Sequence, residues 1–291
     1  MSDKFISLEV VILKIIDKNI SKDGKSIKFL QMTSDNIITE TAYVDDNDRF
    51  IICYASQLGC LVACSMCYNG IHSNFERNLT QQEIVLQCSN IVEYLNLTNE
   101  YKPILFSCMG IGEALLNYEN VIQAILELSK KYPKSKFALA TTGIKTDLIP
   151  KIAEDLKNID HFKLTISLHG SNDILRKQLI PIHTSVSDLK MAVRKYQEIT
   201  VHKCEWNYVL LSGVNDSEKN AIELVNFLNQ NDNVKLSVFN EIESCPFKAS
   251  KNSEMFKQLL QENGISCKAF EPAGKDIGAA CGQMATHYLK K

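Results

Sequence analysis

The chain lacks a long uninterrupted apolar run. No stretch of its 291 residues approaches the roughly 20 apolar residues that cross a bilayer. The first residues also lack the basic region followed by an apolar run that marks a secretion signal. We therefore expect a soluble, cytoplasmic protein with no membrane partner.

An excess of charge of either sign is also missing. The 32 Lys and Arg residues nearly balance 34 Asp and Glu residues, for a net charge of −2 and a pI near 6.3. This balance gives no global attraction to nucleic acid, so RNA binding would need a local basic face. Repeats, low-complexity tracts and long linkers are absent from the sequence. The length and the 45% hydrophobic content suit one large α/β domain or two small ones.

Ten cysteines are present, a number that also occurs in small secreted disulfide proteins. Here they are spread over a long chain, and half of them fall in strand-like or helix-like core patterns. A reducing cytoplasm is therefore the better interpretation.

Three of the cysteines, Cys60, Cys64 and Cys67, lie close together in residues 59–67. A [4Fe-4S] cluster takes a thiolate at each iron, so a local set of three leaves one iron open for a substrate. S-adenosylmethionine (SAM) can chelate that iron, and an electron from the reduced cluster can then break a carbon–sulfur bond and start radical chemistry. The alternatives are buried structural thiols or a zinc knuckle, but zinc sites usually use four ligands and paired two-residue spacings.

Apolar, β-branched runs alternate with segments of helical periodicity between about residues 50 and 240. Six such repeats predict parallel strands with right-handed crossovers, and hence an α/β fold built on a partial (β/α)6 barrel. The predicted strands are 50–54, 104–109, 137–141, 162–168, 204–211 and 235–239, and the predicted helices are 80–94, 118–131, 147–156, 186–199 and 216–229.

Segments on either side of this barrel complete the predicted domain organisation. Residues 1–49 form a small β-rich N-terminal cap, residues 50–245 the barrel and residues 246–291 a C-terminal α/β extension. Within the outer two, the predicted strands are 5–16, 26–31, 36–44 and 265–270, and the predicted helices are 253–261 and 277–289.

Polar residues follow several strands at the rim where such folds carry their chemistry. A glycine lets the backbone approach a ligand, and the carboxylate of Glu113 can accept a hydrogen bond from an ammonium group. The two-sided amide of Asn240 can read an adenine edge. An ordinary turn, surface or core role is the alternative for each. The candidates for cofactor binding are Gly112, Glu113, Ser167, Leu168, His169 and Asn240.

Two cysteines outside the triplet also lie near predicted element ends. Cys53 precedes Cys60 by seven residues, and Cys281 is expected at the start of the last helix, where a helix N-terminus would favour a thiolate. From the residues alone, the simpler interpretation of each is a buried structural cysteine.

At these motifs the chain resembles the dual-cysteine radical-SAM RNA adenine methyltransferases of RlmN/Cfr type. The resemblance runs from about residue 26 to the end of the chain. The stretches that carry it are 53–60, 112–115, 167–169, 210–216 and 276–283.

The resemblance implies methyl transfer to an adenine ring carbon, carbon 2 or carbon 8, in 23S rRNA or tRNA. One SAM would methylate Cys281, and a second would yield the radical that takes hydrogen from that methyl group, so two are used per turnover. After addition to the base, Glu40 would take the ring proton and Cys53 would attack the Cys281 sulfur as a disulfide forms. A carbon of an aromatic ring is a poor nucleophile, which explains the need for a covalent adduct and a resolving thiolate.

Several positions depart from the pattern of this family. Ala140 stands where the family has a serine, so Thr141 or Thr142 would have to supply the hydroxyl. Met66 replaces an aromatic residue, and residues 68–70 (Tyr-Asn-Gly) replace small ones. Arginines common before the last cysteine are absent from residues 270–274, and the N-terminal accessory domain is missing or reduced to about 25 residues.

These departures concern the substrate side, which leaves three interpretations. The leading one is an RNA methyltransferase that acts as a monomer and receives electrons from a flavodoxin or ferredoxin. The second keeps the mechanism but uses a small-molecule or peptide acceptor. The third is a non-enzymatic Fe–S redox sensor in which Cys53 and Cys281 form a reversible disulfide.

Overall fold

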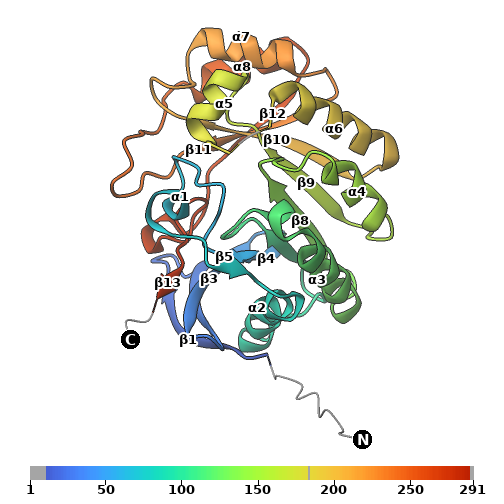
Figure 1. Ribbon diagram of the computed structural model, residues 1–291, viewed down its shortest axis with the longest axis vertical. Coiled ribbons are helices and arrows are strands. Elements are labelled where there is room, and N and C mark those ends of the chain that lie inside the picture. The colour runs from blue at the N-terminus through green and yellow to red at the C-terminus, as the bar shows by residue number, and fades with distance from the viewer. Residues whose placement is uncertain (1–10, 183, 289–291) are drawn as a thin grey trace, which may run out of the picture.

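One continuous, strongly curved sheet organises the protein (Figure 1). The computed structural model describes residues 11–182 and 184–288. Within them the sheet has eleven strands, in the order β1-β2-β3-β4-β7-β8-β9-β10-β11-β12, with β13 on the free part of β3. The strands are β1 (Leu13–Ile20), β2 (Ser26–Thr33), β3 (Ile37–Asp46), β4 (Arg49–Cys53), β7 (Ile104–Cys108), β8 (Lys136–Thr141), β9 (Phe162–Ser167), β10 (Lys203–Leu210), β11 (Asn233–Val238), β12 (Ser266–Phe270) and β13 (His287–Tyr288).

From β4 to β12 every neighbouring pair of strands is parallel, and helices cover the outer side of the sheet (Figure 1). The longer helices are α2 (Gln81–Tyr94), α3 (Tyr118–Lys131), α4 (Leu148–Asp155), α6 (Val186–Ile199), α7 (Glu218–Phe227) and α8 (Ser253–Glu262). The predicted α/β partial barrel is confirmed, with β12 as a further parallel strand beyond the six expected. No helix in the described ranges is long and apolar enough to span a membrane.

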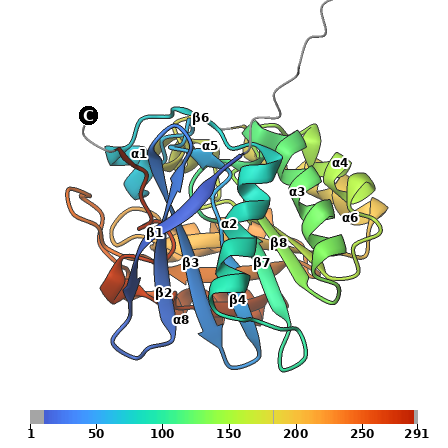
Figure 2. The same ribbon diagram turned by 90° about the horizontal axis from the view of Figure 1, so that it is seen from below.

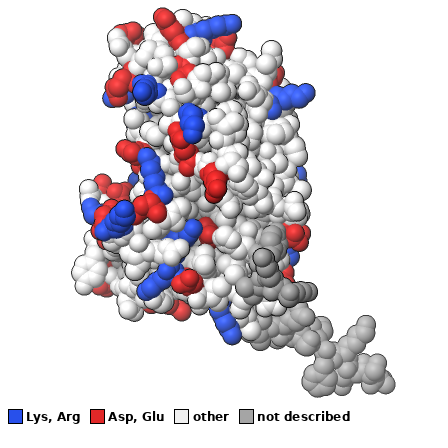
Figure 3. Space-filling view, turned by 90° about the vertical axis from the view of Figure 1, so that its left-hand side faces the viewer, with Lys and Arg blue, Asp and Glu red and all other residues white. Residues whose placement is uncertain are grey.

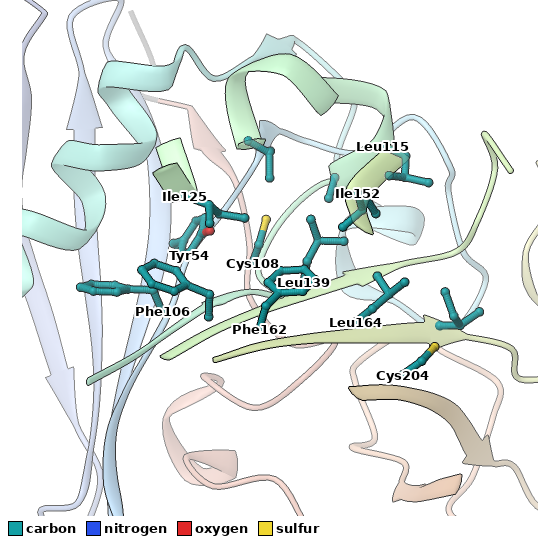
Figure 4. Close-up of a cluster of buried hydrophobic side chains, with 14 of the residues drawn as sticks. Tyr54, Phe106, Cys108, Leu115, Ile125, Leu139, Ile152, Phe162, Leu164 and Cys204 are labelled. Atoms are coloured by element: carbon teal, nitrogen blue, oxygen red, sulfur yellow. The ribbon is translucent and has the colours of Figure 1, made fainter. Parts of the chain in front are cut away.

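The core lies between this sheet and its helices (Figure 4). Leu139 and Leu164 of neighbouring strands are almost fully buried, and so are Ile125 of α3 and Ile152 of α4. Such side chains recur every second residue in the strands and every third or fourth in the helices, which is the pattern that identified these elements in the sequence.

Residues 13–53 form an antiparallel meander of β1 to β4 that joins the edge of the parallel sheet (Figure 2). The predicted strands 26–31 and 36–44 correspond to β2 and β3. The predicted strand 5–16 falls partly outside the described residues, and β1 begins at Leu13. Because strands from all three predicted domains belong to one sheet, the domain division at residues 49 and 245 stays a prediction.

The predicted helix 277–289 is wrong. The chain makes only a 3-10 turn, η2 (Lys275–Ile277), and then an irregular loop that ends in β13. Gly278 and Gly282 have φ of 64° and 83°, and this left-handed backbone ends a helix. Cys281 therefore lies in a turn and not at the start of a helix.

A core truncation tests the packing. Leu164→Ala removes a fully buried side chain in β9, so we expect the free energy of unfolding to fall by about 2–5 kcal/mol in urea denaturation. Ile174→Ala is the control, because Ile174 is 85% exposed. Equal stability of both variants would contradict the placement of the core.

Candidate functional site

The three clustered cysteines lie in a loop between β5 (Gln57–Leu58) and α1 (Tyr68–His72). Gly59 turns the chain into this loop with a φ of 76°. A Cβ on Gly59 would lie 2.0 Å from the Asn74 backbone oxygen, and one on Gly70 would lie 2.1 Å from the Cys64 backbone oxygen. Both positions thus require glycine, and together they fold the loop back on itself.

Backbone N–H groups point at the sulfurs of this loop. Those of Val62 and Ala63 face Cys60, and those of Asn69 and Gly70 face Cys67. These donors favour the thiolates, although burial is the larger effect and raises the pKa of Cys60 to about 12.

Burial also raises the pKa of Cys64, and the other two thiols add to that rise because they lie nearby. The three thiols and their N–H donors make a donor set suited to an iron–sulfur cluster. No three His, Cys, Asp or Glu side chains in residues 11–182 and 184–288 are arranged around a single metal ion. A cubane cluster takes one thiolate per iron, so its cysteines do not converge on one point.

Glu113 lies near these thiols, in the loop that follows β7, and is 3% exposed. Its carboxylate accepts hydrogen bonds from the Thr141 hydroxyl, from the Thr142 N–H at 2.8 Å and from the Thr142 hydroxyl at 2.9 Å. A further bond comes from the Leu115 N–H at 3.1 Å. Both threonines that follow Ala140 therefore supply a hydroxyl to this rim.

Gly112 holds Glu113 in place. Its φ is 102° and a Cβ there would lie 2.7 Å from the Gln57 Cβ, so the backbone at this point requires glycine. The Gln57 side chain in turn accepts the Glu113 N–H at 2.8 Å.

The end of β9 is dominated by a buried cation that the sequence analysis missed. Arg176, in α5 (Asp173–Leu179), is fully buried and donates to the backbone oxygens of Ser167, Leu168 and Thr142. Leu168 itself is a core side chain with no exposed area. A single arginine in a short helix ordinarily lies at the surface, and no spacing signal distinguished this one.

His169 is buried and its Nδ1 accepts the Val209 N–H at 3.1 Å, which requires a lone pair on that nitrogen. Burial, with the nearby positive charge of Arg176, lowers the pKa of His169 to about 3. The ring is therefore neutral, and its role at the rim is that of a fixed hydrogen-bond acceptor.

Asn240 follows β11 and connects the rim to Cys281. Its side-chain nitrogen donates to the Cys281 backbone oxygen at 3.1 Å. Its side-chain oxygen is buried and has no partner among the described residues, so an acceptor remains available there for a ligand.

Cys53 and Cys281 come from opposite ends of the chain to the same rim. Cys53 ends β4 and is half-buried, Cys281 is exposed, and all ten cysteines are free thiols. Burial raises the pKa of Cys53, and the neighbouring Cys281 raises it further. The structure thus brings together the two cysteines that the sequence singled out.

Glu40, on β3, is 1% exposed and binds the segment that carries Cys281. It accepts the Ala285 N–H at 2.9 Å and contacts His287 Nε2 at 2.7 Å. Lys28 Nζ lies 3.3 Å from the same carboxylate. These residues line a cavity of about 300 Å³ together with Tyr68, Glu241, Ile242, Glu243, Gly278 and Gln283.

Comparison with known proteins identifies the family. Residues 54–225 match the model of the Radical SAM superfamily. The chain is 35% identical, over 100% of its length and 84% of the relative's, to the probable dual-specificity RNA methyltransferase RlmN of Thermosipho melanesiensis. It is 31% identical to the dual-specificity RNA methyltransferase RlmN of Francisella tularensis subsp. novicida, over 97% of this chain and 78% of that protein.

The chain is a radical SAM protein of the RlmN family. The fold agrees, because the crystal structure of a radical SAM methyltransferase from Sphaerobacter thermophilus superposes with a TM-score of 0.85 at 31% identity, over 94% of this chain and 81% of that one. Methylornithine synthase, with a TM-score of 0.52 at 15% identity over 73% of this chain and 61% of that one, shares the fold alone. The chain is therefore a methyltransferase of RlmN type, and its family implies a [4Fe-4S] cluster and SAM.

The neutral His169 makes a prediction about pH. Because burial lowers its pKa below the ordinary 6.5, its contribution to stability is complete above pH 6.5 and is lost as the pH falls from 6.5 towards 3. Between pH 7.5 and 5.5 the free energy of unfolding should fall by about 1.4 kcal/mol more in the wild type than in His169→Gln. Urea denaturation at both values measures this. If the free energy of unfolding fell equally in the two proteins, the pKa of His169 would not be lowered by folding.

Proposed function

We propose that the protein methylates a ring carbon of adenine, carbon 2 or carbon 8, in 23S rRNA or tRNA through a methylated Cys281 that Cys53 resolves. The main support is the position of Cys281, in a loop fixed beside the cluster cysteines and close to Cys53. Cys60, Cys64 and Cys67 would hold the cluster, with a flavodoxin or ferredoxin as the electron donor.

SAM and the cluster would supply the methyl group, the radical that activates it, and the acceptor for the returning electron. Glu113 would accept hydrogen bonds from the amino group of SAM, since its carboxylate is held by Thr141 and Thr142 beside the cluster thiols. The backbone at Gly112, the rim formed by Ser167, Leu168 and His169, and the free oxygen of Asn240 would surround the rest of the cofactor.

The protein's own residues would then act in order. The Cys281 sulfur would attack the methyl carbon of SAM, S-adenosylhomocysteine would leave, and the thiol proton would pass to solvent. Once the activated carbon has bonded to the base, Glu40 takes the ring proton and the electron pair of that carbon–hydrogen bond stays in the adduct. The Cys53 thiolate attacks the Cys281 sulfur, the sulfur–carbon bond breaks, and the released carbon takes a proton to become the methyl group. An external thiol reductant reopens the disulfide.

Two cysteine variants test this sequence. In anaerobic assays with reductant, SAM and RNA, Cys281→Ala should give no methylated adenine, because it has no sulfur to carry the methyl group. Cys53→Ala should carry a methyl-sized mass on Cys281 and accumulate a covalent protein–RNA adduct. Mass spectrometry of the 270–288 peptide and of digested RNA measures both.

Cys267→Ala is the matched control, because Cys267 lies on β12 away from these thiols and should retain full activity. Full methylation of RNA by Cys281→Ala would reject the mechanism.

The cofactor role of Glu113 has its own test. Glu113→Gln removes the charge and places an N–H₂ group against the Thr142 N–H, so SAM affinity of the cluster-loaded protein should fall at least about tenfold. Equilibrium binding measures it against Glu119→Gln, an exposed glutamate on α3. Matched affinities in the two variants would remove Glu113 from the cofactor site.

A small-molecule or peptide acceptor remains the second candidate, because the charge distribution favours it. The net charge is −2, and basic and acidic side chains are interspersed on the face shown in Figure 3. RNA binding predicts an affinity that falls steeply with salt. Affinity that is absent or independent of salt would favour this second acceptor class.

A further inference from the structure

Three hydrogen bonds join the cysteine-rich loop to the loop that carries Cys281. Tyr68 N–H donates to the Gly282 oxygen at 2.8 Å, and Gly59 N–H donates to the Thr286 hydroxyl at 3.0 Å. The side-chain nitrogen of Asn69 donates to the Met284 oxygen at 2.5 Å. We call these three bonds the clasp.

Asn69 contributes the only side-chain donor of the clasp and is 3% exposed. Its backbone N–H faces the sulfur of Cys67, so one residue contacts both a thiol of the triplet and the Cys281 loop. If the Asn69 side chain stopped donating this bond, the Met284 oxygen would be left without a partner. Water could not replace the bond without opening the site.

The Cys281 loop depends on such contacts for its position. It has no regular structure between η2 and β13, and the glycines on both sides of Cys281 have positive φ. Glycine backbone has many accessible conformations, so fixing the loop carries a large entropic cost that specific contacts must offset. Asn240 and Glu40 hold the loop from other elements, and the clasp ties it to the cysteine-rich loop.

We propose that Asn69 is a positioning residue, which places Cys281 for methyl transfer by fixing its loop to the loop that holds the cluster. This inference rests on the proposed function. Residues 68–70 depart from the family pattern, and this role would explain why an asparagine stands among them. It also means that ordering of the cysteine-rich loop by the cluster would order the loop that receives the methyl group.

The test compares three variants of the cluster-loaded protein. Asn69→Asp keeps the shape but sets a carboxylate oxygen against the Met284 oxygen. Thr286→Val removes the hydroxyl that accepts the Gly59 N–H, and so breaks the clasp from the Cys281 loop. If both variants give the same result, the result is not due to a folding defect at position 69. Asn90→Ala is the control, since Asn90 also donates a side-chain N–H to a backbone oxygen, that of Leu13 on β1 at 2.8 Å, and does not belong to the clasp.

Two readouts are needed. Amide hydrogen exchange of the 278–288 peptide should be about tenfold faster in Asn69→Asp and Thr286→Val than in the wild type. Iron content and cluster absorbance should be retained, and the rate of Cys281 methylation should fall by a similar factor. Asn90→Ala should change neither quantity.

The outcomes separate the two proposals. Unchanged exchange in both clasp variants, or faster exchange with an unaltered methylation rate, would overturn the positioning role. Loss of the cluster in Asn69→Asp would also overturn it, because Asn69 would then serve the cluster and not Cys281. If wild-type Cys281 is never methylated while exchange still rises in the clasp variants, the proposed function fails and the loop contact stands.

Discussion

Cys281 reaches the site because β13 pairs with β3 and not with β12, the strand that precedes it in the sequence. The chain leaves one edge of the parallel sheet, crosses the rim and ends on the antiparallel meander at the other side. Glu40 holds that end through Ala285 and His287. The Glu40 carboxylate is 1% exposed. Removing one partner of a buried charge costs about 3–5 kcal/mol of stability, so the loss of either donor would destabilise this end of the chain. Glu40 is therefore one of the anchors on which the closure of the site depends, together with Asn240 and the clasp.

Burial also governs the ionisation of the cysteines at the rim. Burial raises the pKa of Cys60, Cys64 and Cys53, so each thiol needs a nearby positive charge to become a thiolate. In the proposed site, the irons of a cluster would supply that charge to the first two. Lys235 lowers the pKa of Cys53, but by less than burial raises it. The Cys53 thiol would therefore be harder to ionise than thiols bound to a cluster.

The sequence predicted those parts of the fold and site that repeat or that cluster along the chain. The ends of α3 and α6 were predicted correctly because the apolar spacing of both helices is regular up to their ends. The triplet of cysteines was found because it is clustered within nine residues, and Glu113 because it lies in a glycine-containing segment after a predicted strand. Arg176 was missed since a buried guanidinium leaves no local pattern, and the last helix was predicted wrongly because helical periodicity outweighed two glycines. Contacts such as that of Asn69 with Met284 join residues far apart in sequence, and no spacing rule predicts them.

Glu40 has two tasks under the proposed function, and the geometry relates them. Its Oε2 accepts the Ala285 N–H, while Oε1 faces both His287 and Lys28. A proton taken from the base would neutralise the carboxylate and weaken the hydrogen bonds that it makes with Ala285 N–H and His287, which loosens the hold on the C-terminal segment. That weakening would come just when Cys53 must approach the Cys281 sulfur. The clasp at Asn69 does not involve Glu40, so it would keep the loop on the rim while the other anchor loosens.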